Sequence, residues 1–319
     1  MVLLLNIVYC CDDGYAPYVG VSMISCIENN MYDFENVTFH IVEENISDFN
    51  KNKLKKIVDS YKNCKIKFYP FICEFNIPES NYPPIGYATV LLADIIYVDK
   101  VVYIDGDTLI LNSFKELMDL ELGDNYAAGV LDPSPSISRE KIGFSSVDNY
   151  YNAGVVLFDL KKIRENGMQK KLTKELEKPY RSHDQDIINL VLKNHILTIS
   201  IKYNFFGHFL ELKYEEVMEI CSINENFYTK NEVECAKKDI VCTHFLNLFC
   251  DVPWRDKSNP MFIKFKEYVD KTPFSYNDIF VETNYPFWKR VMHKLLRNIP
   301  PILYRNVAKI YFKRLYEEN

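Results

Sequence analysis

The sequence predicts an α/β fold built on a mostly parallel central sheet. Strand and helix patterns alternate through the first 110 residues, at spacings that suit βαβ units. The first strand pattern, residues 3–10, is apolar on both faces, which is typical of a buried parallel strand. Polar residues follow several strands, and open α/β sheets bind ligands at that edge. The 319 residues suffice for one large domain, or for one domain with an appendage.

The N-terminal part of the chain supplies most of this alternation. The run "LLLNIVYC" is apolar throughout and is predicted to be the first core strand. Ser47 precedes the second helical pattern and is a candidate N-cap residue. Strands are expected at residues 3–10, 36–44, 64–71 and 100–111, and helices at residues 18–30, 46–61 and 87–96.

The pattern continues less regularly after residue 120. The segment "DNYAAGVLD" is expected to end a strand at Asp132, and "YYNAGVVLFDL" is expected to be a strand that leads into the helix "KKIRENG". The segment "SHDQDIINLVLKNH" begins with Ser182 and has Gln185 three residues later, which predicts a helix with a capping box. Residues 203–238 show weak periodicity and are expected to be irregular, and "DIVCTHF" is expected to be a short strand.

The C-terminal segment differs from the rest in charge. The formal net charge is −6, yet residues 285–316 carry eight Lys or Arg and no acid, so the remainder carries −14. We therefore divide the chain into a domain of residues 1–260 and a helical, basic, amphipathic region of residues 261–319. This tail resembles an interfacial membrane anchor, and the alternative is a helix pair that packs on the acidic body. The acidic balance excludes nucleic acid as a partner.

The nine cysteines are irregularly spaced and form no CxxC pair, which indicates free thiols in a reducing compartment. The N-terminus lacks a basic segment and a cleavage-like site, so no targeting peptide is predicted. The protein is therefore expected to be cytoplasmic, and peripheral on the inner face of the plasma membrane through its tail.

Two Asp-x-Asp triplets are candidates for chemistry. Asp105 and Asp107 close a strand and are separated by Gly106, so they are either turn residues or ligands of a divalent cation. The triplet Asp184-Gln185-Asp186 opens a helix, where acids favour the helix dipole. His244 ends another strand. Two carboxylates with one imidazole suit Mn²⁺ better than Mg²⁺. The chain lacks both the dinucleotide fingerprint and the Walker A pattern.

Five segments, in this order, resemble glycosyltransferase family 8, which includes lipopolysaccharide galactosyl- and glucosyltransferases and glycogenin. They are "NIVYCCDDGYAPYVGVSMISCIENN", "DKVVYIDGDTLIL", "YYNAGVVLFDLKKIRENG", "HDQDIINLVL" and "HFLNLFCDVPW". The resemblance implies a Rossmann-like nucleotide-diphospho-sugar transferase fold of the GT-A type and a UDP-sugar donor. It also implies dependence on Mn²⁺, with Mg²⁺ as the alternative ion, and retention of anomeric configuration.

The resemblance also implies roles for individual residues. Asp105, Asp107 and His244 would hold the metal, and Asp105 would also contact the donor. The nucleotide and sugar of the donor would be contacted by Asp12, Cys10, Tyr15 and Asn152, and the catalytic set would be Gln185, Asp184 and Asp132. Family members usually carry cations at the positions of Thr89 and Val252, so Arg255 and Lys257 are candidates to replace them.

The resemblance implies transfer of galactose or glucose from a UDP-sugar to lipopolysaccharide or another surface glycan. Because the Gln185 carboxamide is a poor nucleophile, front-face displacement is expected rather than the double displacement that needs a carboxylate. One alternative is a catalytically impaired member of the same fold that binds nucleotide sugar or glycan. A second is a metal-dependent nucleotidyltransferase, which would carry a glycine-rich phosphate loop where this chain has "CCDDGYAPY".

Overall fold

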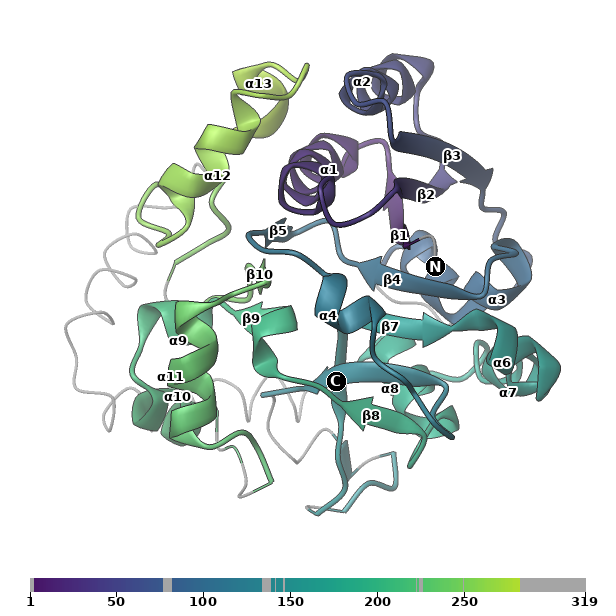
Figure 1. The fold of residues 1–319 in the computed structure, drawn as a ribbon. Helices are drawn as coiled ribbons and strands as arrows, with labels where there is room; N and C mark the ends of the chain where they lie inside the picture. The colour runs from purple at the N-terminus through teal and green to yellow at the C-terminus, as the bar shows by residue number, and fades with distance from the viewer. Residues whose placement is uncertain are drawn as a thin grey trace.

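The structure is a computed structural model that describes residues 3–281 apart from 77–81, 134–138, 141, 146, 222, 224–225 and 249. Its central sheet has seven strands in the order β3-β2-β1-β4-β7-β6-β8 (Figure 1). Only β7 runs antiparallel to both of its neighbours, whereas the other strand pairs are parallel. The predicted α/β class with a mostly parallel sheet is confirmed. The strands are β1 (Leu4–Asp12), β2 (Asn36–Glu44), β3 (Cys64–Pro70), β4 (Lys100–Ile104), β6 (Ala127–Leu131), β7 (Tyr151–Asp159) and β8 (Ile196–Thr198).

A second, smaller sheet lies beside the first. Its order is β5-β10-β9, with β5 (Thr108–Ile110) antiparallel to β10 (Cys242–His244) and β9 (Phe205–Phe206) parallel to β10. Because β5 follows β4 after three residues, the small sheet begins where β4 of the large sheet ends. The segment between them is Asp105-Gly106-Asp107.

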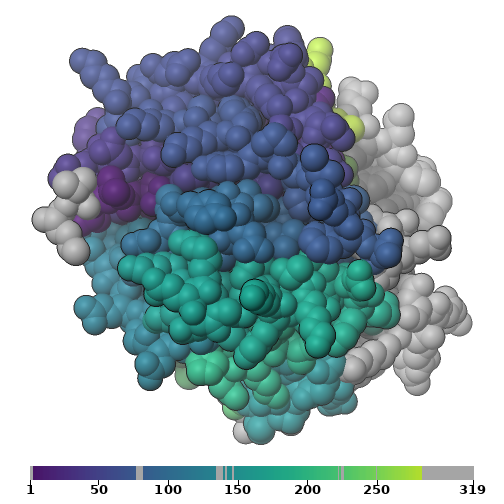
Figure 2. Space-filling model, turned by 90° about the vertical axis from the view of Figure 1, so that its right-hand side faces the viewer, coloured from purple at the N-terminus to yellow at the C-terminus, as the bar shows by residue number. Residues whose placement is uncertain are grey.

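Helices cover the sheet. On the face drawn in Figure 2, the N-terminal residues (purple to blue) and the later residues (teal to green) pack directly against one another. The helices of the first half are α1 (Ala16–Asn30), α2 (Asp48–Asp59), η1 (Pro84–Leu91), α3 (Leu92–Ile95) and α4 (Lys115–Met118). Those of the second half are α6 (Leu160–Glu165), α7 (Met168–Lys174), α8 (His183–Val191), η2 (Ile201–Asn204), α9 (His208–Glu211), α10 (Tyr214–Ile220), α11 (Lys230–Lys238), α12 (Phe262–Val269) and α13 (Tyr276–Ile279).

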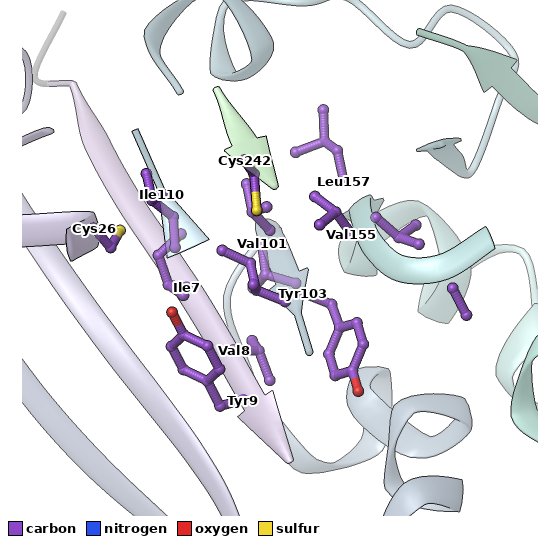
Figure 3. Packing of buried hydrophobic residues seen from close by; sticks show 14 of the residues in the cluster. Ile7, Val8, Tyr9, Cys26, Val101, Tyr103, Ile110, Val155, Leu157 and Cys242 are labelled. Atoms are coloured by element: carbon purple, nitrogen blue, oxygen red, sulfur yellow. The ribbon is translucent and has the colours of Figure 1, made fainter. Parts of the chain in front are cut away.

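Strand β1 lies at the centre of the core and is covered on both faces. Successive side chains of a strand point to opposite faces. The Tyr9 hydroxyl reaches Ser22 of α1 at 2.9 Å, while the next residue, Cys10, contacts Thr89 of η1. Figure 3 shows side chains from β1, β4, β5, β7 and β10 packed together in this core. The apolar run predicted as the first core strand is therefore buried as expected.

Two local predictions differ in outcome. Ser47 is the N-cap of α2, since its hydroxyl accepts a hydrogen bond from the Asn50 N–H at 3.3 Å. The helix expected at residues 87–96 begins earlier, as the 3₁₀ helix η1 from Pro84 to Leu91, and continues as the short α-helix α3. Pro lacks an N–H group, and the Thr89 hydroxyl donates to the carbonyl three residues earlier, at Gly86, over 3.2 Å. Both features favour the tighter helix.

The capping box predicted for α8 is wrong. The side chain of Ser182 makes no capping hydrogen bond, and Gln185 is bonded to the backbone of β7 instead. The Asp186 carboxylate accepts the Ser182 N–H at 2.8 Å. The prediction that residues 203–238 are irregular is also wrong, because they hold β9, α9, α10 and α11. Elements of nine residues or fewer are too short to show a clear period.

The described part of the C-terminal region packs on the body of the protein. Tyr268 of α12 accepts a hydrogen bond from Asn29 of α1 at 3.0 Å, and Asp278 of α13 pairs with Lys53 at 2.6 Å. Figure 1 shows both helices beside α1. The basic tail, residues 285–316, lies outside the described residues, so the division at residue 260 stays a prediction. None of the helices in the described part combines the length and apolar character that crossing a bilayer requires. All nine cysteines are free thiols.

Candidate active site

The predicted site residues converge at one edge of the large sheet. Asp105 follows β4 and Asp132 follows β6. Asn152 lies at the beginning of β7, which reaches the same edge because β7 runs antiparallel to both β4 and β6. Gln185 lies in the first turn of α8, and His244 ends β10 of the small sheet. Residues spread over 140 positions of sequence are thus brought together by the two sheets.

Asp105, Asp107 and His244 form a cluster in which one ligand atom of each lies within 4.8 Å of the others. The His244 Nε2 atom is 3.2 Å from Asp107 Oδ1 and 3.9 Å from Asp105 Oδ2. The pairing of β5 with β10 sets Thr108 opposite His244, which brings the imidazole beside Asp107. A Cβ atom on Gly106 would lie 2.9 Å from the Tyr15 ring, so only glycine fits between the two acids.

The other nitrogen of the His244 ring is held by Asn204, which the sequence prediction missed. The Nδ1 atom lies 3.2 Å from Asn204 Oδ1, and Asn204 Nδ2 donates to Asn152 Oδ1 at 2.8 Å. Because the amide oxygen can only accept, Nδ1 of His244 carries a proton, and Nε2 is the nitrogen that faces the carboxylates. A single Asn in "KYNFF" gives no sequence signal for this role.

The electrostatics of the cluster suit a cation. Burial and the charge of Asp107 raise the pKa of Asp105 to about 6. Burial alone would raise the pKa of Asp107, but the charge and hydrogen bond of His244 lower it. Burial alone would lower the pKa of His244, yet the charge of Asp107 raises it. Two carboxylates thus share one buried imidazole, and oxygen and nitrogen donors in this arrangement fit a divalent transition ion.

Asp132, Asn152 and Gln185 form a hydrogen-bonded network next to the cluster. Asp132 Oδ2 accepts from Asn152 Nδ2 at 2.8 Å and from Gln185 Nε2 at 3.3 Å. Gln185 Oε1 accepts from Asn152 Nδ2 at 3.2 Å and from the Ala153 N–H at 3.0 Å. The Gln185 carboxamide is therefore fixed in place by the backbone of β7 and by Asp132.

The Asp184-Gln185-Asp186 triplet divides into different roles. Asp184 is buried, and its Oδ1 accepts the Tyr82 hydroxyl at 2.9 Å. Burial and the charge of Asp105 raise the pKa of Asp184 to about 7. Asp186 accepts the Tyr150 hydroxyl at 2.5 Å and the Ser182 N–H at 2.8 Å, so its oxygens serve the helix end. Asp184 and Gln185 therefore belong to the candidate site, whereas Asp186 anchors the start of α8.

Asp12, Cys10 and Tyr15 lie together where β1 leads into α1. Asp12 Oδ1 accepts the Tyr15 N–H at 2.9 Å, which stabilises the turn before α1. The charges of Asp105 and Asp184 act on the Cys10 thiol, and those of Asp107 and Asp105 act on the Tyr15 ring. These three residues therefore lie beside the carboxylates of the site.

Arg255, one of the two candidate replacement cations, also lies near this turn. The positive charge of Arg255 opposes the rise in the pKa of Tyr15 and Tyr18 that burial causes. Trp254 comes directly before Arg255 in the chain, and the ring of Tyr18 stacks on its indole with a centroid distance of 4.2 Å. Lys257 is exposed two residues further along.

Known proteins share both sequence and fold with this chain. A putative glycosyltransferase of Haemophilus influenzae is 28% identical over 254 residues, 76% of this chain and 71% of that protein. A lipopolysaccharide 1,2-glucosyltransferase of Escherichia coli is 26% identical over 267 residues, 80% and 74% of the two chains. The crystal structure of the galactosyltransferase LgtC with donor and acceptor sugar analogues is 24% identical, with a TM-score of 0.66 over 85% of this chain and 97% of LgtC.

The bifunctional glycosyltransferase WbbM gives a TM-score of 0.71 at 21% identity, over 87% of this chain and 51% of WbbM. These structural likenesses confirm the predicted GT-A type fold. The sequence profile of glycosyl transferase family 8 matches residues 6–258, which include every residue of the site described above. The chain belongs to glycosyl transferase family 8.

Proposed function

We propose that this protein is a retaining glycosyltransferase that moves glucose or galactose from a UDP-sugar to lipopolysaccharide or another surface glycan. The observation that carries the proposal is one continuous chain of hydrogen bonds. It runs from His244 through Asn204 to Asn152, and from there to Asp132 and Gln185. A cation site is thus coupled to a set of amide and acid groups, which are the groups that bind sugar hydroxyls.

The named relatives support this choice of donor and acceptor. The Escherichia coli protein is a lipopolysaccharide 1,2-glucosyltransferase, and a Salmonella typhimurium relative, 26% identical over 216 residues, is a lipopolysaccharide 1,3-galactosyltransferase. Membership of the family also favours transfer of a sugar over transfer of a nucleotide, so the nucleotidyltransferase alternative is set aside.

Asp105, Asp107 and His244 would hold the metal, and the mixed oxygen and nitrogen donors favour Mn²⁺ over Mg²⁺. A bound divalent cation would supply Lewis acidity that neutralises charge on the departing UDP. Asn204 would not touch the metal, but its hydrogen bond to Nδ1 fixes the ring orientation of His244 and leaves Nε2 to bind the ion.

The donor would lie along the sheet edge with its nucleotide near β1. Asp12, Cys10 and Tyr15 would contact the nucleotide, and Arg255 would approach the diphosphate from the Trp254 side. Asn152, Asp132 and Asp184 would bind the sugar hydroxyls. Asn152 and Asp132 are hydrogen-bonded to the Gln185 carboxamide, and Asp184 precedes Gln185 in the chain.

We infer front-face displacement, in which the acceptor attacks on the side from which UDP leaves. Gln185 is held with its amide in the Asp132 network, and a carboxamide can stabilise an oxocarbenium-like sugar through its dipole but is a poor nucleophile. Asp186, the other acid of α8, has its oxygens bonded to Tyr150 and Ser182. The double-displacement route, which needs a free nucleophilic carboxylate, is therefore the weaker choice.

The proposal is tested by UDP release from UDP-glucose and UDP-galactose, with lipopolysaccharide as acceptor and with or without Mn²⁺. We expect transfer from one donor only in the presence of the metal, and loss of Mn²⁺-dependent UDP binding in Asp107→Ala. Tight UDP binding without turnover of any donor would instead favour the alternative of a catalytically impaired binding protein. Unchanged UDP affinity in Asp107→Ala would contradict the metal assignment.

A further inference from the structure

Two buried polar atoms beside the candidate active site have no hydrogen-bond partner among the residues that the structure describes. They are Nδ1 of His208 and Nδ2 of Asn247. Buried polar groups are nearly always bonded in native proteins, so each exception needs an explanation. One explanation is a partner that arrives with a ligand.

His208 and Asn247 are neighbours in space because the pairing of β9 with β10 continues beyond both strands. The Gly207 N–H donates to the His244 carbonyl at 3.0 Å, and the His208 N–H donates to the Leu246 carbonyl at 2.9 Å. The Asn247 carboxamide packs on Gly207, where a Cβ atom would lie only 2.4 Å from Asn247 Oδ1. The two side chains thus come from adjacent positions of two paired segments.

The orientation of each group is set by its surroundings. Asn259 Nδ2 donates to Asn247 Oδ1 at 3.3 Å, which leaves Asn247 Nδ2 as a donor without an acceptor. Burial lowers the pKa of His208 to about 4. The ring is therefore neutral at physiological pH and one of its nitrogens can accept a hydrogen bond.

The order of the small sheet indicates which substrate would reach this pair. Asp107 lies before β5, His244 lies on the central strand β10, and His208 follows β9 at the opposite edge. Helix α1, beside the nucleotide residues, contacts β5, as Figure 1 shows. The charges of Asp132 and His244 both act on the His208 ring. His208 therefore lies beyond the metal cluster on the side away from the nucleotide residues, and that side is free for a second substrate when the donor lies along β1.

We propose that His208 and Asn247 form an acceptor subsite, in which His208 Nδ1 accepts a hydrogen bond from a sugar hydroxyl and Asn247 Nδ2 donates one to a sugar oxygen. The inference rests on the proposed function, because it takes the second substrate to be a glycan. His208 is a specificity-determining residue in this scheme and takes no part in bond breaking.

The test measures equilibrium binding of the core oligosaccharide released from lipopolysaccharide by mild acid, in the presence of UDP and Mn²⁺. The matched variants are His208→Asn and His208→Gln. The Asn amide reaches the position of ring Nδ1, whereas the Gln amide reaches that of Nε2. We expect His208→Asn to bind within about threefold of the native protein, and His208→Gln and His208→Ala to bind about tenfold more weakly or worse.

UDP affinity and the unfolding temperature should stay unchanged in these variants, which separates an acceptor contact from a folding defect. His195→Ala, at an exposed histidine that contacts Tyr126, is the control and should bind like the native protein. Equal affinity of all variants would overturn the inference, and so would an absence of oligosaccharide binding by the native protein. Oligosaccharide binding without turnover of either UDP-hexose would count against the proposed function alone.

Discussion

Gly154 shows at the scale of one residue how closely the metal cluster is packed. A Cβ atom at this position would lie 2.3 Å from His244 Cε1 and 2.6 Å from His244 Nδ1. We expect Gly154→Ala to displace the imidazole and to lower Mn²⁺ affinity about 10- to 100-fold, the usual cost of disturbing the support of a ligand. The measurement is calorimetric titration with Mn²⁺. Gly129→Ala on β6 is the matched control, because its Cβ would meet nothing closer than 3.5 Å. Equal affinities in both variants would contradict the assignment.

Arg255 is the side chain that we propose to contact the donor diphosphate. Its charge acts on Tyr15 and Tyr18, beside the metal cluster. A hydrogen bond to a charged group contributes roughly 1.5–3 kcal/mol, but Arg255 is exposed, so solvent screening reduces its contribution. We therefore expect Arg255→Ala to weaken UDP binding about fivefold. Lys257→Ala, two residues away, is the control, and an equal loss in both variants would argue for a diffuse electrostatic effect.

Asp184 makes stability depend on pH. Its pKa is raised to about 7 by burial and by the charge of Asp105. Since the unfolded chain ionises near its ordinary pKa, about 3.9, the stability that neutral Asp184 contributes is lost as pH rises from about 4 to 7. Asp184→Asn keeps an acceptor for Tyr82 but cannot ionise.

In metal-free protein, the unfolding temperature of Asp184→Asn relative to the native protein should therefore rise between pH 5 and pH 8. The gain in unfolding free energy should be on the order of 3 kcal/mol. Thermal unfolding at several pH values measures this difference. Parallel pH profiles for the two proteins would show that Asp184 does not titrate in this range.

At the scale of elements, the sequence predicted the strands whose residue pattern follows from their burial in the sheet. The runs that became β1 and β7 are largely apolar on both faces, and the run that became β3 alternates between apolar and exposed residues, so these patterns do not depend on distant contacts. The helix at residues 87–96 was predicted without its 3₁₀ first half, because apolar content does not reveal the tight turn that Pro84 favours. Strand β8 has only three residues, and pairing with β6 rather than its own pattern makes it a strand.

The first turn of α8 shows why the site was predicted in part. Ser182 and Gln185 match a capping box in sequence, but that pattern cannot show that Ala153 and Asn152 approach Gln185 from β7. Tertiary contacts decided the role of Gln185 and left capping to Asp186. The metal cluster was predictable because strand ends carry a recognisable triplet and a histidine. Asn204 and His208 were not, because their roles arise from the pairing of β9 with β10.

Asp186 provides a test of how α8 is anchored. Asp186→Ala removes the acceptor for the Ser182 N–H and for the buried Tyr150 hydroxyl. We expect this substitution to lower the free energy of unfolding by about 2–4 kcal/mol, since it removes the carboxylate acceptor from both donors. Urea denaturation measures the change. Ser182→Ala removes no capping side chain and should cost below about 0.5 kcal/mol. A larger loss of unfolding free energy in Ser182→Ala would indicate that the Ser182 side chain caps α8 after all.

At the scale of the whole molecule, the two sheets explain how one site collects both substrates. The large sheet supplies Asp105, Asp132 and Asn152 at a single edge, and the small sheet supplies His244 and His208 across from them. The nucleotide residues lie where β1 enters α1. A donor and an acceptor would thus meet over the hydrogen bonds that join the two sheets through Asn204. Neither sheet contains the complete site.

The acidic body and the basic tail should govern where the protein binds a membrane. Residues 285–316 carry eight Lys or Arg and no acid, and each cation near an anionic leaflet contributes about 1 kcal/mol. We propose that this segment holds the protein at the surface that bears its acceptor. Removal of residues 285–319 leaves all described elements in place, since the last of them, α13, ends at Ile279.

We expect the full chain to sediment with vesicles that contain anionic lipid, and the truncated chain to stay in solution. Binding of the full chain should weaken as salt is raised, because the attraction is largely electrostatic. Vesicles of neutral lipid are the control for apolar insertion, and UDP affinity shows that the truncated protein remains folded. If the truncated chain sediments equally well, the membrane contact lies in the body. If neither chain sediments, the basic segment instead packs on the acidic surface of residues 1–260.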